Sequence, residues 1–210
     1  SRRGSRFTPS QQAAWDEHSD AWVIPDEAVD EPGFDLRRWF GREAPLVVEI
    51  GPGVGEATGV LAAARPEHDV LALEVWRPGI AAGLAEVAAA GATNVRFCSV
   101  DAVWVLEHLV APDSLAGLWT FFPDPWPKKK HHKNRFVQTE NLTLLARRTA
   151  VGGRLCFRTD DEDYFEWTRA HLAAHAAWQL KEGTPWPFEQ TTFFEERMKA
   201  KRDLEASRVP

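Results

Sequence analysis

The feature that most constrains the fold of this 210-residue chain is a strand-like run that leads through closely spaced glycines into a helix-like stretch. Leu46 to Ile50 is apolar except for Glu49, and Gly51, Gly53 and Gly55 follow at once. Glycines let the backbone approach a ligand closely, and here they lead into a helix N-terminus. The pattern is typical of the nucleoside or dinucleotide site of a doubly wound sheet, although an ordinary tight turn would show the same glycines.

The same alternation of strands and helices continues along the chain. Further strands are expected at 69–75, 95–100, 115–122 and 153–159. Helices are expected at 56–65, 79–90, 103–109, 136–150 and 164–174. Alternating elements of these lengths predict an α/β fold with a mostly parallel sheet that is covered by helices on both faces.

Acidic residues stand near the ends of three successive expected strands. Glu49 precedes the glycines, Glu74 follows 25 residues later, and Asp101 ends the third strand. Because ligands in such sheets bind beyond the carboxyl ends of the strands, we expect the three acids to line one site. Glu74 would accept hydrogen bonds from ribose hydroxyls, and Asp101 would lie near an adenine edge. Each acid alone could equally be a helix cap or a solvated strand end.

A rigid loop with three prolines in five residues follows the expected fourth strand. Neither a helix nor a central strand can accommodate Pro123, Pro125 and Pro127, so we expect Asp124 and Trp126 to lie on a loop. The next residues, 128–135, carry five fixed positive charges and two histidines. Basic side chains beside an aromatic ring are typical of sites that bind a phosphate backbone and stack a base. A charge run alone is more often a solvated surface, but the adjacent acid favours a functional site.

The bulk composition limits the class of protein. The formal net charge is -6, so any contact with nucleic acid must come from local basic patches. Cys98 and Cys156 lie in apolar runs, as expected of reduced thiols, and no metal is expected because His131 and His132 are adjacent and no Cys/His cluster accompanies them. Without a long apolar run or a signal-type segment, we expect a cytoplasmic protein that does not enter a membrane.

The two ends of the chain differ from its middle. Residues 1–33 are polar and rich in Arg, Ser, Gln and Pro, so we expect a flexible basic N-terminal arm before a single domain at 34–210. One or two terminal strands are expected between Trp178 and Met198, and the charged residues after Met198 are expected to fray.

Five motifs can now be combined. They are Val48-Glu-Ile-Gly-Pro-Gly-Val-Gly-Glu56, Leu73-Glu-Val75, Asp101, Phe122-Pro-Asp-Pro-Trp-Pro-Lys128 and Arg158-Thr-Asp160. Together they resemble the bacterial tRNA (guanine-N7)-methyltransferase family, and the Arg-rich opening is similar to that family's N-terminal arm. The resemblance spans nearly the whole chain, and the proline block with its basic sequel is its specific part. Pro52 and Trp76 depart from the family pattern.

The resemblance implies a Rossmann-like class I methyltransferase with a mostly parallel, seven-stranded doubly wound sheet. It also implies transfer of a methyl group from S-adenosylmethionine to N7 of a guanosine in the variable loop of tRNA, with Asp124 as the catalytic residue. The implied cofactor-binding residues are Glu49, Gly51, Gly53, Glu74, Asp101 and Asp124. The expected partner is tRNA, and both a monomer and a homodimer remain open.

The resemblance further implies contacts with the substrate. The implied substrate-binding residues are Lys128, Asp160, Thr192, Phe193, Phe194 and Glu195. The implied RNA-contacting residues are Lys130, His131, His132, Lys133, Asn134 and Arg135. Trp126 could stack on an extruded base or pack inward.

Other functions remain as alternatives. A methyltransferase that acts on another RNA, or on a protein amine or amide, would share the cofactor motifs, but the basic block argues against a protein substrate. A nicotinamide dehydrogenase is disfavoured because the third glycine of its fingerprint is missing and Glu49 would face a pyrophosphate. A non-catalytic RNA-binding module would not need all four acids.

Overall fold

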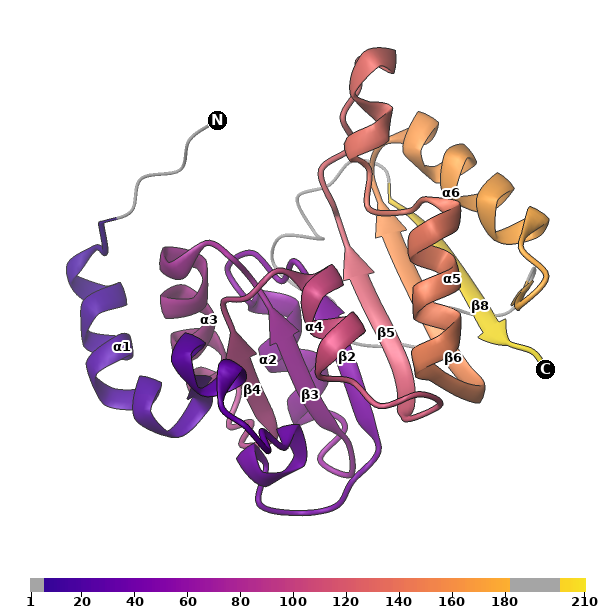
Figure 1. Cartoon of the computed structure of the whole chain (residues 1–210). Helices are drawn as coiled ribbons and strands as arrows, with labels where there is room; N and C mark the ends of the chain where they lie inside the picture. Colours follow the sequence, from indigo (N-terminus) through magenta and orange to yellow (C-terminus); the bar gives the residue numbers. More distant parts are fainter. Residues whose placement is uncertain (1–5, 182–200) are drawn as a thin grey trace.

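The computed structural model describes residues 6–181 and 201–210, and within them an eight-stranded sheet forms the centre of the molecule (Figure 1). The strands are β1 (Val23–Ile24), β2 (Leu46–Ile50), β3 (Asp69–Leu73), β4 (Val95–Cys98), β5 (Leu115–Phe121), β6 (Thr149–Thr159), β7 (Trp178–Leu180) and β8 (Arg202–Arg208). The helices are α1 (Pro9–Trp22), α2 (Glu56–Ala63), α3 (Arg77–Ala89), α4 (Ala102–His108), α5 (Thr139–Arg148) and α6 (Glu162–Ala174). Three short 3₁₀ helices are η1 (Asp26–Asp30), η2 (Leu36–Trp39) and η3 (Lys129–Asn134).

The sheet is mostly parallel, as predicted. Its order is β1-β4-β3-β2-β5-β6-β8-β7, and β8 pairs antiparallel with both of its neighbours. The described part has one strand more than the seven expected. The additional strand is β1, in which Val23 and Ile24 pair with Phe97 and Cys98 of β4 at the sheet edge. Two residues are too few to give a strand signal in the sequence.

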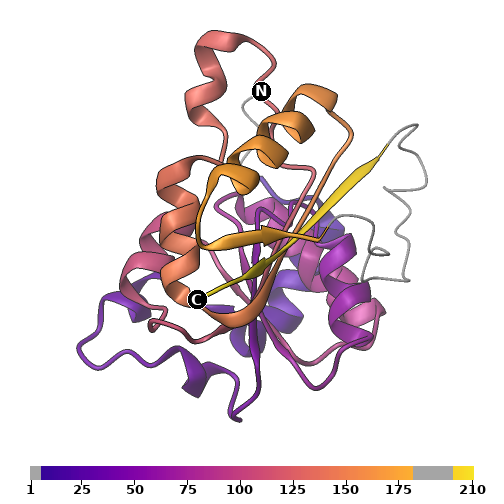
Figure 2. The same ribbon diagram turned by 90° about the vertical axis from the view of Figure 1, so that its right-hand side faces the viewer.

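Apolar side chains alternate between the two faces of the sheet and form two cores. On adjacent positions of β2, Val47 joins one core and Val48 the other, and Val70 and Leu71 of β3 divide in the same way. Helices α1, α2 and α3 contribute to the first core, whereas α4, α5 and α6 contribute to the second. Figure 2 shows helices on both sides of the sheet. The predicted doubly wound α/β architecture is therefore confirmed.

The segment before residue 34 packs on the domain. Helix α1 is capped by Thr8 and contacts α3, where the Gln11 side-chain amide donates to the Pro78 carbonyl oxygen over 3.0 Å. Ala14, Ile24 and Val29 are buried. The expectation of an arm outside the core is therefore wrong for residues 9–30, because a few apolar residues in a polar stretch supply the buried contacts.

The expectation that the chain frays after Met198 is also wrong for residues 202–208. They form β8, in which Leu204 and Ala206 are buried between β6 and β7. Arg158 of β6 is 4% exposed and forms an ion pair with Asp203 of β8. The charged residues conceal this strand because its apolar positions are few and alternate with polar ones.

Candidate active site

Five acids lie at one edge of the sheet. Strands β2 to β6 run parallel, so their carboxyl ends meet at the upper edge in Figure 1. Glu49 belongs to β2, and Glu74, Asp101, Asp124 and Asp160 follow β3, β4, β5 and β6 within three residues. The parallel topology therefore brings together the acidic positions that the sequence singles out.

The glycine loop between β2 and α2 combines open space with tight packing. Gly51, Gly53 and Gly55 all have positive φ, at 68°, 63° and 75°. A Cβ atom on Gly51 or Gly53 would meet no heavy atom within 4 Å, whereas one on Gly55 would lie 2.5 Å from Gly83 Cα of α3. Gly51 and Gly53 thus leave room for a ligand against the backbone, while Gly55 lets two helices approach each other.

Glu74 holds the shape of this loop. Its carboxylate accepts hydrogen bonds from the backbone N–H of Gly53 and from that of Trp76, each over 2.9 Å. The side of the loop is closed by Gly79, where a Cβ atom would lie 2.4 Å from the Gly53 carbonyl oxygen. The sequence predicts a ligand-binding role for Glu74 but not its hydrogen bond to the loop, because only the folded chain brings Gly53 to Glu74.

Glu49 is a buried carboxyl group directly before the glycines. It is 2% exposed and accepts a hydrogen bond from the Thr58 hydroxyl over 2.5 Å. Burial raises the pKa of Glu49 to about 7; the Thr58 bond lowers this pKa and the charge of Glu74 raises it. A cation placed nearby would favour the ionised form of Glu49 and would itself be stabilised.

Asp101 and Asp161, the residue after Asp160, each cap a helix. Asp101 is exposed and accepts a hydrogen bond from the Trp104 N–H at the start of α4 over 3.0 Å. Asp161 accepts one from the Tyr164 N–H at the start of α6 over 2.7 Å. The cap alternative is therefore realised for Asp101, and Asp161 caps the next helix in the same way, whereas Asp160 remains an exposed residue beside that cap.

Two exposed apolar side chains that were not among the predicted site residues accompany the acids. Val54 of the glycine loop is 45% exposed, and Val75, which follows Glu74, is 66% exposed. Their position beside the open glycines suits an apolar ring system. The carboxylate groups, the open glycines and the exposed valines together fit a cofactor that combines a flat heterocycle, a ribose and a positive charge, namely S-adenosylmethionine. A valine directly after the acid of the second strand was the available signal.

The proline loop presents Asp124 in a strained backbone. Asp124 is exposed, and the residues on either side of the Pro-Asp-Pro segment have positive φ, with 50° at Phe122 and 46° at Trp126. Positive φ is uncommon for residues other than glycine. The loop begins with a hydrogen bond from the Phe122 N–H to the Arg158 carbonyl oxygen of β6 over 2.7 Å.

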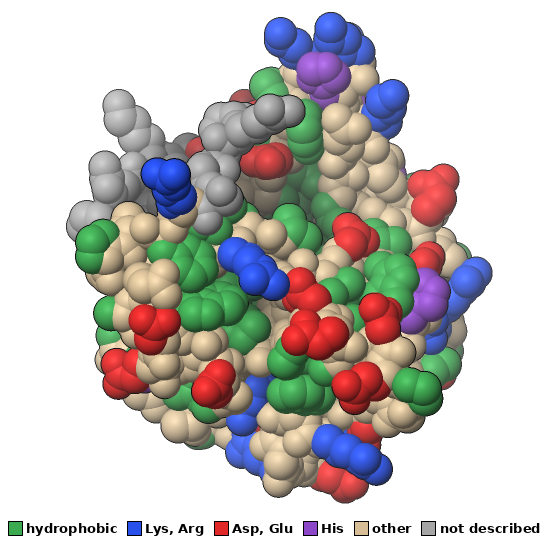
Figure 3. Space-filling view, turned by 60° about the vertical axis from the view of Figure 1, so that its left-hand side comes forward, with side chains coloured by type: hydrophobic (Ala, Val, Ile, Leu, Met, Phe, Trp, Pro, Cys, Tyr) green, Lys and Arg blue, Asp and Glu red, His purple; other side chains and the backbone are tan. Residues whose placement is uncertain are grey.

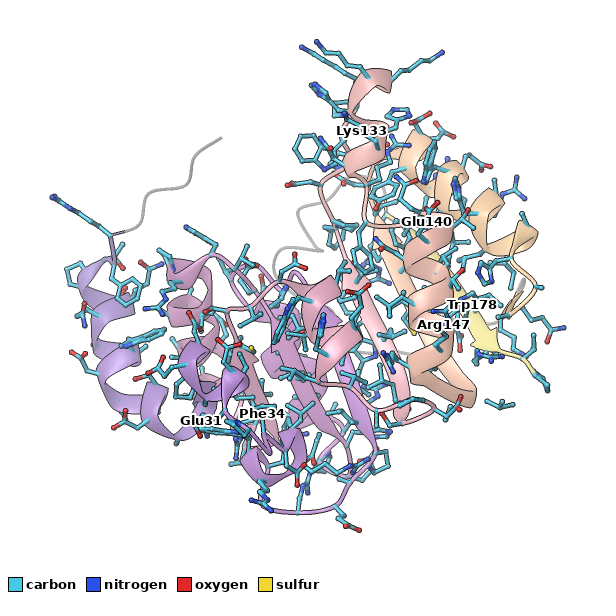
Figure 4. All side chains as sticks on the ribbon, viewed as in Figure 1. Glu31, Phe34, Lys133, Glu140, Arg147 and Trp178 are labelled. Carbon is cyan, nitrogen blue, oxygen red and sulfur yellow. The ribbon has the colours of Figure 1, made fainter. Side chains whose placement is uncertain are left out.

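The basic block forms a projection, η3, beyond the sheet edge. Its residues 128–130 and 133 are exposed lysines, and Lys133 lies on the projection at the top of Figure 4. Figure 3 shows Lys and Arg side chains at the tip and acidic side chains over the face beneath it. The positively charged surface therefore lies close to the acid-lined edge, because only the short proline loop connects the two.

Two members of the basic block point inward. Arg135 is 1% exposed, and its guanidinium donates to the Pro125 carbonyl oxygen over 2.8 Å and to Asp163 over 2.5 Å. His132 lies edge-on to Trp167, with its Nε2 atom 3.6 Å from an Asp163 oxygen. The expectation that Arg135 touches RNA is therefore not supported, because its charged group is enclosed by protein.

Four expected substrate residues, Thr192, Phe193, Phe194 and Glu195, lie outside the described residues. In the two described ranges, no cluster of three or more His, Cys, Asp or Glu side chains is placed to hold a metal. No helix there is long and apolar enough to cross a membrane.

A separate hollow of about 430 Å³ lies away from the acids. Glu31 and Phe34, which contribute to its lining, are near the lower end of the molecule, opposite the projection (Figure 4). The hollow is therefore not part of the site at the carboxyl edge.

Comparisons with known proteins agree with this geometry. Residues 43–205 match the family model described as "Putative methyltransferase". The chain is 60% identical over 164 residues to a tRNA (guanine-N(7)-)-methyltransferase of Nocardioides sp., covering 78% of this chain and 66% of the relative. It is 39% identical over 209 residues to the enzyme of the same name from Cutibacterium acnes, covering 93% and 76%. The chain thus spans slightly less than two thirds of the Nocardioides relative.

Solved structures share the fold at low identity. An rRNA methyltransferase from Catenulisporales acidiphilia, crystallised with S-adenosylmethionine, superposes with a TM-score of 0.56 at 16% identity. The match covers 85% of this chain and 93% of that one. An identity this low supports the class I methyltransferase fold alone.

Proposed function

Since the chain belongs to the bacterial tRNA (guanine-N7)-methyltransferase family, we propose that it transfers a methyl group from S-adenosylmethionine to N7 of a guanosine in the variable loop of tRNA, forming 7-methylguanosine. The observation that carries the proposal is the arrangement at the carboxyl edge of the sheet. An open glycine loop with buried acids stands beside an exposed aspartate on a rigid loop, and exposed lysines follow at once.

The glycine-loop side of the site would hold the cofactor. Gly51 and Gly53 leave space at the backbone, and Glu74 and Asp101 offer carboxylate oxygens to ribose hydroxyls and to the adenine edge. Val75 would pack against the adenine ring. S-adenosylmethionine supplies an electrophilic methyl group on a positively charged sulfur.

The charges of Glu49 and Asp124 would favour that positive charge. Glu49 contributes because its carboxyl group has a pKa of about 7 and ionises more readily beside a cation. Asp124 contributes from the adjacent loop, where it is the acid nearest in sequence to the lysines of η3. The two residues thus connect cofactor binding with the reacting centre.

Asp124 would position the guanine. Guanine N7 carries a lone pair and no proton, so its attack needs no general base, and positioning dominates catalysis. The Asp124 carboxylate can accept hydrogen bonds from the guanine N1–H and the exocyclic amine, and its charge favours the positive charge that the purine gains. Trp126 is half-buried beside His131, with 5.9 Å between the ring centroids, and its remaining surface would stack on the base.

The projection η3 would hold the tRNA backbone. The proposed contacts are Lys128, Lys130, His131, Lys133 and Asn134, together with Asp160 at the end of β6. Exposed lysines bind phosphates without reading sequence, so they would orient the RNA above Asp124. A neighbouring acid such as Asp160 suits the amino groups of a base better than a phosphate.

Purified protein, unmodified tRNA and methyl-labelled S-adenosylmethionine test the proposal. Nucleoside analysis of the RNA is expected to show labelled 7-methylguanosine. Parallel incubations with rRNA and with a protein mixture are expected to incorporate no label. Label in protein, or in another RNA but not in tRNA, would overturn the proposal. The methyltransferase fold would then serve a different substrate.

A further inference from the structure

We propose that Arg135 is a positioning residue for methyl transfer, which holds the Asp124 loop in its strained shape instead of binding tRNA. The inference rests on the proposed function, because it assigns the chemistry to Asp124. The evidence is the set of contacts made by the Arg135 guanidinium, which is buried and does not belong to the exposed basic surface.

The Asp124 loop has a backbone that does not hold its shape by local preference. Phe122 and Trp126 both have positive φ, and both precede a proline, which restricts their backbone further. Each such residue costs on the order of 1–3 kcal/mol and persists only where surrounding contacts impose it. The loop therefore needs hydrogen bonds from outside.

The structure provides such a bond on each side of Asp124. Before it, the Phe122 N–H donates to the Arg158 carbonyl oxygen over 2.7 Å. After it, Pro125 accepts from the Arg135 guanidinium over 2.8 Å. Arg135 is thus the side chain that fixes the peptide directly behind the proposed catalytic carboxylate.

Arg135 is itself held by α6. Its guanidinium donates to Asp163 and lies 4.9 Å from the ring centroid of Tyr164 and 5.1 Å from that of Trp167. The hydrogen bond from Arg135 lowers the pKa of Asp163. A planar guanidinium can donate to two acceptors and stack on aromatic rings at once, which a lysine ammonium cannot reproduce.

The burial of Arg135 separates it from its neighbours on η3. Arg135 is 1% exposed, whereas Lys130 and Lys133 of the same basic block are exposed. A phosphate could not reach the guanidinium without displacing α6 side chains. Loss of Arg135 should therefore slow the reaction, and loss of Lys133 should weaken tRNA binding.

The test compares Arg135→Lys with Lys133→Gln in single-turnover methyl transfer, with rates referred to the number of cofactor-binding sites. Arg135→Lys is expected to lower the rate at saturating tRNA by about 10²-fold while leaving the tRNA Kd and its salt dependence unchanged. Lys133→Gln is expected to raise the tRNA Kd and to flatten its salt dependence. A raised Kd and flattened salt dependence in Arg135→Lys, or a normal rate, would overturn the inference.

Hydrogen exchange gives a second readout that does not depend on activity. In Arg135→Lys, amide exchange is expected to accelerate in a peptide covering residues 121–126 but not in one covering the glycine loop. Unchanged exchange at 121–126 would contradict the inference. If Arg135→Lys does not fold, Asp163→Ala carries both measurements, because Asp163 is 69% exposed and its replacement by Ala removes the acceptor that anchors Arg135 without emptying the core. A wild-type protein that makes no 7-methylguanosine would refute the proposed function instead.

Discussion

Both loops that form the site contain residues with positive φ, but they adopt it by different means. In the glycine loop, Gly51, Gly53 and Gly55 adopt positive φ at little cost because they lack a Cβ atom. In the proline loop, Phe122 and Trp126 adopt positive φ against their preference. The first loop thus adopts its positive φ angles by the preference of its own residues and is held further by Glu74, whereas the φ angles of the second loop depend on distant contacts such as Arg135.

The comparison also separates two tasks. The glycine loop offers open space, buried acids and apolar side chains, which suit a cofactor that must bind and leave repeatedly. The proline loop holds one exposed carboxylate in a rigid backbone, which suits alignment of a reacting base. Variants on the first loop should therefore change binding and stability, and variants on the second should change the rate.

The largest expected effect is on the proline loop. Asp124→Ala is expected to lower single-turnover methyl transfer by at least about 10³-fold, because the variant loses both the guanine contacts and the favourable charge. Its affinity for S-adenosylmethionine, measured by calorimetry, should fall by less than the rate. Asp124→Asn is the matched control that keeps the shape and loses the charge. Near-normal turnover in both variants would contradict the assignment of base alignment to the proline loop.

The second effect tests the packing of the glycine loop. In Gly55→Ala the new methyl group would overlap Gly83 and adopt an unfavourable φ, so the free energy of unfolding should fall by roughly 3–4 kcal/mol. In Gly53→Ala the new methyl group meets no atom within 4 Å, so the free energy of unfolding should fall by only about 1–2 kcal/mol. The same methyl group should weaken cofactor binding. Denaturant unfolding measures the stability of both variants. Equal losses in the two variants would show that the close approach of α2 and α3 is unimportant.

The third effect concerns the buried carboxyl group of Glu49. Its folded pKa is raised from 4.5 to about 7, so between these pH values the folded state keeps a proton that the unfolded state has released. The contribution of this group to stability is therefore present below pH 4.5 and is lost as the pH rises toward 7.

Glu49→Gln removes this dependence. The stability of the variant relative to the wild type, measured without cofactor, should increase by roughly 3 kcal/mol between pH 4.5 and pH 8. Thr58→Val is the control, since it should raise the pKa of Glu49 further and extend the decline in stability to higher pH. A difference between Glu49→Gln and wild type that does not vary with pH would mean that the carboxyl group stays ionised in the fold.

The smallest effect concerns the charged surface beside the proline loop. Replacement of both Lys130 and Lys133 by Ala should reduce the slope of log Kd for tRNA against log salt concentration. The expected reduction is about 0.7–0.9 for each lost phosphate contact. Filter binding at several salt concentrations measures the slope. An unchanged slope would show that η3 is a solvated surface and that the proline loop is not flanked by an RNA-binding element.

Much of the site could be predicted because it is encoded in short windows of sequence. The glycines, the acids near the strand ends and the exposed lysines all follow from patterns of a few residues and from the parallel topology. The roles of Arg135 and His132 could not be read in this way. Their partners Pro125, Asp163 and Trp167 are 10 to 35 residues away, so composition places both among the exposed basic residues.

The ends of the fold were mispredicted for a related reason. Helix α1 and strand β8 bury only a few apolar side chains each, such as Ala14, Leu204 and Ala206, within polar segments. Average polarity therefore indicated an arm and a frayed tail, whereas stability depends on where those few side chains pack. Asp101 and Asp161 show the same limit, because one acid at a helix start fits both a cap and a ligand contact.

Mapping the methylated nucleotide in tRNA tests the central claim most directly. Borohydride reduction and aniline treatment cleave RNA selectively at 7-methylguanosine, so the position of cleavage identifies the modified base. After incubation of unmodified tRNA with the protein and S-adenosylmethionine, we expect one cleavage, at a guanosine of the variable loop, that is absent with Asp124→Ala. No cleavage, or cleavage that persists with Asp124→Ala, would contradict it.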